Sequence, residues 1–275
     1  MMEVKPRVAK IVFFSGGKGG GGVSTIVASF SVALSELVNR HVLVVDFGYG
    51  PNATTTKLFG QDPGTVGVYD FVFGRASPRP IKVEGYRVFL LTNGYKDPNE
   101  VVDALARAYA SNPYRFTEEL TNRLASFLTR LALSLGVNHI IVDLPSTTIG
   151  PHTFAVLAMA DVINIVALHS NTHIDEVASA YKLAIDVNPG AVVNVVVNKV
   201  YPTGDPESQF KQFTHGEGRV FPIEYSVYVS YIVDVKRDIP IAWEFPGNWR
   251  RDIMRFTQSV KRQVDRVLSA VRPSA

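Results

Sequence analysis

Cysteine is absent from this 275-residue chain, and tryptophan occurs only twice. Without a thiol the chain can form no disulfide bond and can place no thiolate on a metal or a substrate, so we expect a cytoplasmic protein. No apolar run reaches the roughly 18–20 residues that a membrane-spanning helix needs, and residues 1–10 lack the apolar core of a signal peptide. We therefore expect no membrane partner.

Charge is modest overall but unevenly placed. The whole chain carries a formal net charge of +3, with 28 basic and 25 acidic residues. From Asn248 to Ala275 there are seven basic and two acidic residues, which is a net of +5 and leaves −2 for the rest. A local surplus of this kind indicates an acidic partner that the whole-chain value conceals.

Short, apolar, β-branched runs recur along the chain and are mostly continuous, as in strands buried on both faces of a parallel sheet. They are Ala9–Phe14, His41–Val45, Arg87–Thr92, Ile140–Val142, Val162–Leu168, Val192–Val197 and Arg219–Pro222. Helical stripes lie between most of them, one from Ile26 to Leu37 and another from Leu120 to Leu135. This alternation predicts a doubly wound α/β fold with a mostly parallel sheet of about seven strands. We expect a single domain over residues 1–275, with surface loops at Gly74–Pro80 and Pro202–Gly218.

A glycine-rich loop follows the first predicted strand and leads into the first helical stripe. Strand, glycine loop and helix form the context in which backbone N–H groups converge on phosphate oxygens. Against the phosphate-loop pattern G-x-x-x-x-G-K-[ST], Gly17 and Gly22 hold the glycine positions and Ser24 holds the magnesium-binding hydroxyl. Val23 stands where the lysine is expected, so a cation for the β- and γ-phosphates is missing. A turn without any ligand is the alternative interpretation.

Polar residues also follow other predicted strands, at the sheet edge where doubly wound folds bind ligands. Asp46 lies at the end of the second strand, and Asp143 at the end of the fourth suits a magnesium-water ligand. Asn198 follows the sixth strand, where its amide could pair with an adenine edge. Each of these signals is weak alone, because such residues also act as turn formers and helix caps.

Together, these positions resemble the ParA/MinD superfamily of deviant Walker-A ATPases, which partition DNA or position cell machinery. The loop of that family reads K-G-G-x-G-K-[ST]-T, and residues 18–25 follow it except at the second lysine. The next family motif, V-D-x-D-P-Q-G-N-A-T, lies over residues 45–54, with Gly48 in place of the second aspartate. The resemblance implies a set of nucleotide-binding positions: Gly17, Lys18, Gly19, Gly20, Gly21, Gly22, Val23, Ser24, Thr25, Asp46, Gly48, Asp143 and Asn198. It also implies magnesium contacts at Ser24, Asp46 and Asp143 where the metal is retained.

The two departures, Val23 and Gly48, remove the phosphate cation and the carboxylate that orients the attacking water in the family. Positioning and electrostatics supply most of the catalysis in phosphoryl transfer. We therefore interpret the chain as a degenerate ParA-like protein that is not an ATPase, has no catalytic residue and needs no cofactor. One alternative is an ATP- and magnesium-binding protein with slow hydrolysis and nucleotide-driven homodimerisation, in which Lys18 reaches the partner's phosphates. Another alternative is a scaffold for an unknown partner protein.

The basic C-terminal segment, residues 248–272, has a helical apolar stripe that we expect to pack on the sheet. Its basic residues fall largely off that stripe, on a face that is either simply solvated or suited to the phosphate backbone of DNA. A helix lying on a membrane surface is a third interpretation, which the mostly valine stripe without bulky anchoring residues disfavours. The candidate DNA-binding residues are Arg250, Arg251, Arg255, Lys261, Arg262 and Arg266. ParA-like proteins bind DNA non-specifically through such residues, so the resemblance predicts non-specific DNA binding in chromosome or plasmid organisation or segregation.

Overall fold

The computed structural model describes residues 7–15, 20–48, 54–94, 97–111, 113–145, 150–231 and 247–270. Its strands are β1 (Ala9–Phe14), β2 (Val42–Asp46), β3 (Ile81–Lys82), β4 (Val88–Leu91), β5 (His139–Asp143), β6 (Val162–Leu168), β7 (Val192–Val200) and β8 (Val220–Glu224). Its α-helices are α1 (Val23–Val38), α2 (Thr54–Leu58), α3 (Val68–Val72), α4 (Pro98–Ser111), α5 (Pro113–Ser134), α6 (Pro151–Ala158), α7 (Ile174–Val187), α8 (Pro206–Phe210), α9 (Val227–Tyr231) and α10 (Asn248–Ala270). Two 3₁₀ turns, η2 (Asn171–His173) and η3 (Lys211–Phe213), complete the described elements.

The strands form one sheet in the order β3-β4-β2-β5-β1-β6-β7-β8. All neighbouring pairs are parallel except β3 with β4. The predicted doubly wound, mostly parallel fold is confirmed, and each of the seven predicted runs contributes a strand. The eighth strand, β3, was not predicted because two exposed residues at an antiparallel edge leave no apolar run in the sequence.

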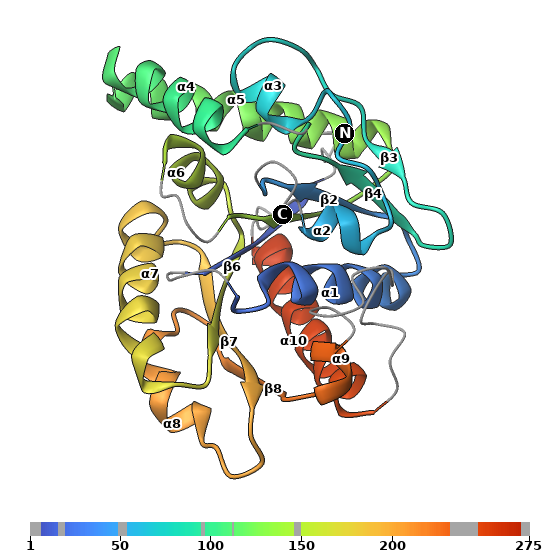
Figure 1. The fold of residues 1–275 in the computed structure, drawn as a ribbon, viewed down its shortest axis with the longest axis vertical. Coiled ribbons are helices and arrows are strands. Elements are labelled where there is room, and N and C mark those ends of the chain that lie inside the picture. The colour runs from blue at the N-terminus through green and yellow to red at the C-terminus, as the bar shows by residue number, and fades with distance from the viewer. Residues whose placement is uncertain are drawn as a thin grey trace.

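Helices cover both faces of the sheet, as buried parallel strands require (Figure 1). On one face α1 and α10 lie together, and the rings of Phe13, Phe30 and Phe256 meet between them and the sheet, with Phe30 and Phe256 centroids 5.2 Å apart. On the other face α3 to α7 bury an apolar cluster against the strands, including Leu124 and Leu128 of the predicted α5 stripe. The strand sequences are continuously apolar because helices cover both faces of the sheet, so side chains on either side of a strand are buried.

A buried amide network fixes α10 to the sheet. The side-chain amides of Asn194 and Gln263 exchange hydrogen bonds of 2.9 and 3.0 Å, and Asn194 also donates to Asn164 Oδ1 at 2.9 Å. The remaining donor of Gln263 reaches the carbonyl of Glu217 at 2.9 Å. Because buried polar groups are costly when unpaired, this network sets the register of α10 on β6 and β7.

The two predicted surface loops differ in outcome. Residues 76–80 of the Gly74–Pro80 segment have no regular secondary structure. The Pro202–Gly218 segment was wrongly expected to be only loop, because α8 and η3 lie within it. Asp205 starts α8 by accepting a hydrogen bond from Ser208 N (3.2 Å), with Pro206 at the first helical position. In the described part of the chain, no helix combines the length and apolarity needed to cross a membrane.

Candidate functional site

The glycine loop joins the carboxyl end of β1 to the start of α1. Gly17, Lys18 and Gly19 lie outside the described residues, whereas Gly20 and Gly22 have φ angles of 101° and 84°, in the left-handed region that favours glycine. The Gly22 carbonyl accepts the first helical hydrogen bond, from Ile26 N at 3.0 Å. The first turn of α1 contains no acidic side chain. Its N–H groups therefore lie at the edge of the sheet without an acidic side chain in the same turn, the arrangement that favours an anion.

Asn198, at the carboxyl end of β7, fastens this loop. Its amide nitrogen donates to the Gly21 carbonyl at 2.9 Å, and its oxygen accepts from Lys199 N at 2.9 Å. The side chain is 3% exposed. A Cβ added at Gly22 would lie 2.4 Å from its nitrogen, which explains why glycine is needed there. The structure thus uses Asn198 to hold the loop, and its contact with adenine remains a prediction.

Val23 occupies the position of the phosphate-loop lysine and is the first residue of α1. Its side chain is 8% exposed and belongs to the apolar cluster between α1, α10 and the sheet. The next two residues, Ser24 and Thr25, are partly buried and buried. The valine therefore adds packing to the helix start and supplies no charge to a phosphate.

Asp46 and Asp143 face each other at the carboxyl ends of the adjacent strands β2 and β5, in direct register. They are 0% and 4% exposed. Among the described residues no lysine, arginine or histidine forms an ion pair with either carboxylate. The sequence predicted each aspartate separately, and the strand register brings the two together.

Hydroxyl groups surround this pair of carboxylates. Thr55 Oγ1, in α2, donates to Asp143 Oδ2 at 2.5 Å, and the Ser24 side chain also hydrogen-bonds Asp143. Thr56 donates to Asp46 Oδ2 from its backbone nitrogen at 2.9 Å and from Oγ1 at 2.7 Å. These threonines lie in the run directly after the second family motif, but sequence reasoning assigned them no role.

Both acids are shifted toward the neutral form. Burial, followed by the charge of Asp46, raises the pKa of Asp143 to about 7, against the hydrogen bonds from Thr55 and Ser24. Burial also raises the pKa of Asp46, although hydrogen bonds from Thr56 and Gly48 oppose the shift. Two carboxylates that share a buried site in this way keep a proton to higher pH than ordinary aspartates, because no cationic side chain among the described residues pairs with them.

Gly48, which replaces the expected second aspartate, is held by its backbone. Its N–H donates to Asp46 Oδ1 at 2.7 Å, and its carbonyl accepts from Asn93 Nδ2 at 2.8 Å. The preceding residue, Phe47, accepts from the Tyr69 hydroxyl at 2.8 Å. Asn93 follows β4 and Tyr69 lies in α3, both far from the motif in sequence, so no sequence pattern indicated their roles.

The candidate DNA-binding residues lie along α10. Of the six, Lys261 is partly buried and the other five are exposed. Three of the six make ion pairs: Arg251 with Glu224 (3.4 Å) and Asp252, Lys261 with Asp265 (2.5 Å), and Arg266 with Glu217. The opposite side of the helix, with Ile253, Phe256, Val260 and Val264, is buried in the core. The basic face is therefore partly neutralised by acidic neighbours.

Sequence comparison gives one distant relative. No protein-family model matches the chain. An iron–sulfur cluster carrier protein from Aquifex aeolicus is 28% identical over 217 residues, which cover 78% of this chain and 54% of the relative. The chain therefore spans about half the length of this curated relative.

Solved structures with the same fold are numerous. The cell division ATPase MinD from Pyrococcus furiosus superposes with a TM-score of 0.68 and 17% identity, covering 93% of this chain and 99% of MinD. MinD from Pyrococcus horikoshii complexed with Mg-ADP gives a TM-score of 0.67, 16% identity and coverage of 94% and 99%. A Borrelia burgdorferi plasmid partition protein bound to AMPPNP gives a TM-score of 0.67, 14% identity and coverage of 94% and 99%. The chain has the fold of the MinD and ParA P-loop ATPases.

These findings correct one expectation from the sequence. We expected that the chain needs no cofactor, because Val23 and Gly48 remove two charged groups. Proteins of this fold are solved with magnesium nucleotides or nucleotide analogues, so the expectation was wrong. The physical reason is that backbone N–H groups and a helix N-terminus also bind phosphate, and the loss of one lysine does not remove them.

Proposed function

We propose that this chain binds ATP with magnesium at the glycine loop and uses the bound nucleotide to form a homodimer, with slow hydrolysis. The observation that carries the proposal is the buried pair Asp46 and Asp143, which lies beside the Ser24 hydroxyl at the N-terminus of α1. An anion site and an unneutralised acidic pair at the same edge are the two halves of a magnesium-nucleotide site.

The acidic pair fits a magnesium ion. Magnesium prefers oxygen ligands, and this site offers the Ser24 hydroxyl and the carboxylates of Asp143 and Asp46. A bound divalent cation would supply the positive charge that the described side chains do not provide, and it would offset the negative charge of the phosphates. Thr55 and Thr56 orient the two carboxylates through their hydroxyls.

Slow hydrolysis and dimerisation follow from what the site retains and what it has lost. Val23 offers no ammonium to the β- and γ-phosphates, and Gly48 offers no carboxylate to a water. The carboxylate acts on the transition state, and the ammonium acts on both phosphate binding and the transition state. Lys18, which lies outside the described residues, is the loop cation of the chain, and in the family that it resembles this lysine reaches the nucleotide of the partner subunit.

The test is calorimetric titration of nucleotide-free protein with ATP, with and without magnesium. We expect saturable binding that depends on magnesium and weakens about 10-fold or more in Ser24→Ala, since a hydrogen bond to a charged group is lost. Ser31→Ala is the matched control, because Ser31 lies on the same helix and donates only to the Val27 carbonyl. Sedimentation should show an ATP-dependent dimer that Lys18→Ala abolishes. Absence of any ATP binding by the unaltered protein would overturn the proposal.

An iron–sulfur carrier function is not part of this proposal. Protein-bound iron–sulfur clusters are held mainly by cysteine thiolates. These 275 residues contain no cysteine. We therefore do not extend the cluster-carrying role of the Aquifex aeolicus relative to these residues.

Non-specific DNA binding on α10 is a second candidate function, favoured by the exposed Arg255 and Arg262, which form no ion pair within the described residues. We expect duplex DNA to show a salt-sensitive shift in electrophoretic mobility with the unaltered protein, because each phosphate contact releases counterions. The double charge reversal Arg255→Glu and Arg262→Glu should abolish this mobility shift. The double reversal Arg115→Glu and Arg130→Glu, at two exposed positions of α5, is the control with the same change of charge. A shift that survives the double reversal would exclude this face of α10.

A further inference from the structure

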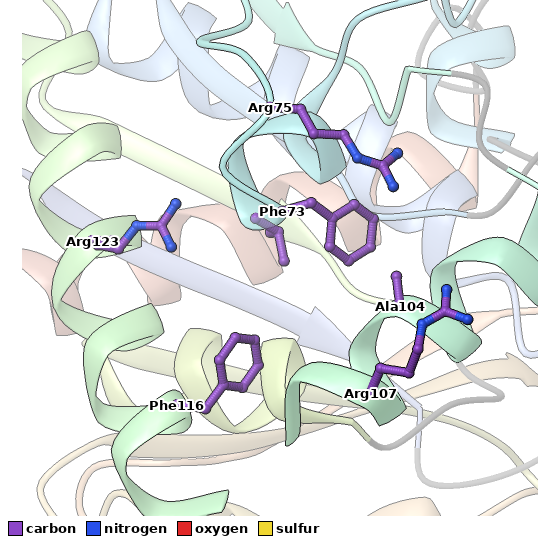
Figure 2. A pocket seen from close by; sticks show the side chains of 7 residues that line it. Phe73, Arg75, Ala104, Arg107, Phe116 and Arg123 are labelled. Atoms are coloured by element: carbon purple, nitrogen blue, oxygen red, sulfur yellow. The ribbon is translucent and has the colours of Figure 1, made fainter. Parts of the chain in front are cut away.

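A hollow of about 460 Å³ lies outside the nucleotide site, between α3, α4 and α5. Figure 2 shows the side chains around it, which come from the end of α3 and the following turn, from α4 and from α5. The lining residues are Val72, Phe73, Arg75, Ala104, Arg107, Phe116 and Arg123. Three of the seven are arginines and none is acidic. Small-molecule sites typically have volumes of about 300–1,000 Å³, so the size is suitable for one ligand.

The three arginines have no carboxylate partner within the described part of the chain. Arg107 is informative, because Asp103 precedes it by one helical turn at a spacing that favours an ion pair. The same spacing does form ion pairs elsewhere, between Arg115 and Glu119 (2.7 Å) and between Lys261 and Asp265 (2.5 Å). Arg107 lines the hollow instead, so positive charge gathers there without an internal counter-charge.

Aromatic rings hold two of the guanidinium groups. Arg75 stacks over the ring of Phe73 at 5.0 Å, and Arg123 lies 5.4 Å over Phe71 and donates to its carbonyl at 3.0 Å. In Figure 2 the Arg75 and Arg107 guanidinium groups extend on the same side of the Phe73 ring, and Arg123 lies on the other side. Cation–π stacking positions an arginine without neutralising its charge, so these groups remain able to bind an anion.

The Phe73 ring also has a fixed place. It stacks on Tyr69 with centroids 6.1 Å apart, and Tyr69 is fully buried and bonded to the Phe47 carbonyl. Phe116 supplies a second aromatic wall from α5. The hollow therefore combines apolar rings with the arginines Arg75 and Arg107. Within the described residues, the guanidinium groups of these two arginines form no hydrogen bond.

We propose that this hollow binds a small phosphate monoester carried on a flat ring. Guanidinium groups match the oxygens of a phosphate in paired hydrogen bonds. Two or three positive guanidinium groups are better balanced by the two negative charges of a phosphate monoester than by the single charge of a carboxylate ligand. The Phe116 ring takes up a flat ring by stacking, and the edge of Phe73, whose faces pack on Tyr69 and Arg75, borders the same space. None of the seven lining residues belongs to the magnesium-nucleotide site, so this binding does not depend on the proposed ATPase function.

Phenyl phosphate is the simplest probe that contains both features, and the arginine side-chain N–H signals in a nitrogen–proton NMR spectrum report on the binding. Inorganic phosphate tests the anion alone, phenol tests the ring alone and benzoate tests a carboxylate in place of the phosphate. We expect phenyl phosphate to shift the Arg75 and Arg107 signals saturably, with a dissociation constant at least about 10-fold below those of the other three compounds.

Variants locate the site. Arg107→Gln should raise the dissociation constant of phenyl phosphate about 10-fold or more, because one charge-assisted hydrogen-bonding group is lost. Arg115→Gln, on α5 but outside the hollow, and Ser24→Ala, in the glycine loop, should leave the constant unchanged. The proposal is overturned if phenyl phosphate binds no better than inorganic phosphate or benzoate, or if Ser24→Ala rather than Arg107→Gln weakens its binding.

Discussion

Replacing Val23 with lysine should tighten ATP binding about 10- to 100-fold, because a charge-assisted hydrogen bond to the phosphates is worth about 1.5–3 kcal/mol. Val23 is buried in the apolar cluster at the start of α1. The aliphatic stem of a lysine can cover the same neighbours while its ammonium group extends toward the loop. The gain should be specific to nucleotides that carry β- and γ-phosphates, so the affinity for AMP should change little.

Val23→Met is the matched control for this experiment. Methionine has a long unbranched side chain like that of lysine but no charge, and it adapts readily to irregular apolar surroundings. Calorimetric titrations of Val23→Lys, Val23→Met and the unaltered protein with ATP and AMP separate the charge from the shape of the side chain. Equal ATP affinities in the two variants would contradict the interpretation that a missing cation limits binding at this loop.

The sequence predicted the fold and the main positions of the site because both are encoded locally. Continuous apolar runs indicate buried parallel strands, and ligands of such sheets bind beyond the strand ends. Asp46 and Asp143 could be singled out in this way. The two-residue strand Ile81–Lys82 could not, because it has no periodic pattern and pairs only at the edge.

Long-range contacts account for what sequence reasoning missed. The hydrogen bond from the Asn198 amide to the Gly21 carbonyl, 177 positions earlier in the chain, was not predicted, and the contact of Asn198 with adenine stays a prediction. The arginine-lined hollow is also invisible in the sequence, because Arg75, Arg107 and Arg123 come from three separate elements. The spacing of residues along the chain does not reveal such long-range contacts. Only the packing of α3, α4 and α5 brings these side chains together.

Replacing Asp143 with asparagine should stabilise the protein in the presence of a metal chelator while abolishing magnesium-dependent ATP binding. Burial and the charge of Asp46 raise the pKa of Asp143 to about 7, whereas in an unfolded chain an aspartate titrates near 3.9. The unfolded chain therefore loses this proton at lower pH than the folded protein. The stabilising contribution of this bound proton is fully present below the pKa of the unfolded chain and is lost as the pH rises through the folded pKa of about 7.

The asparagine removes this titration but keeps an oxygen that can accept from Thr55 and Ser24. At about pH 8 we expect Asp143→Asn to raise the free energy of unfolding by about 2–4 kcal/mol, and at about pH 5 by much less. Urea denaturation at the two pH values, with chelator present, measures the difference. Adding magnesium and ATP should stabilise the unaltered protein and leave the variant unchanged, since a ligand stabilises only the state that binds it.

Asp161→Asn is the control that separates this effect from the loss of an aspartate charge in general, at a partly buried position. Asp161 pairs with Arg7 at 2.8 Å and accepts from Lys10 N at 2.9 Å, so its charge is used within the fold. Its replacement should lower the free energy of unfolding by about 1 kcal/mol, because a partner of opposite charge is lost. If Asp143→Asn also lowers the free energy of unfolding in chelator, other groups of the protein already neutralise Asp143, and no magnesium ion is required at Asp46 and Asp143. If the two variants change stability in opposite directions, the charge of Asp143 is held at a cost to the fold that only a bound cation offsets.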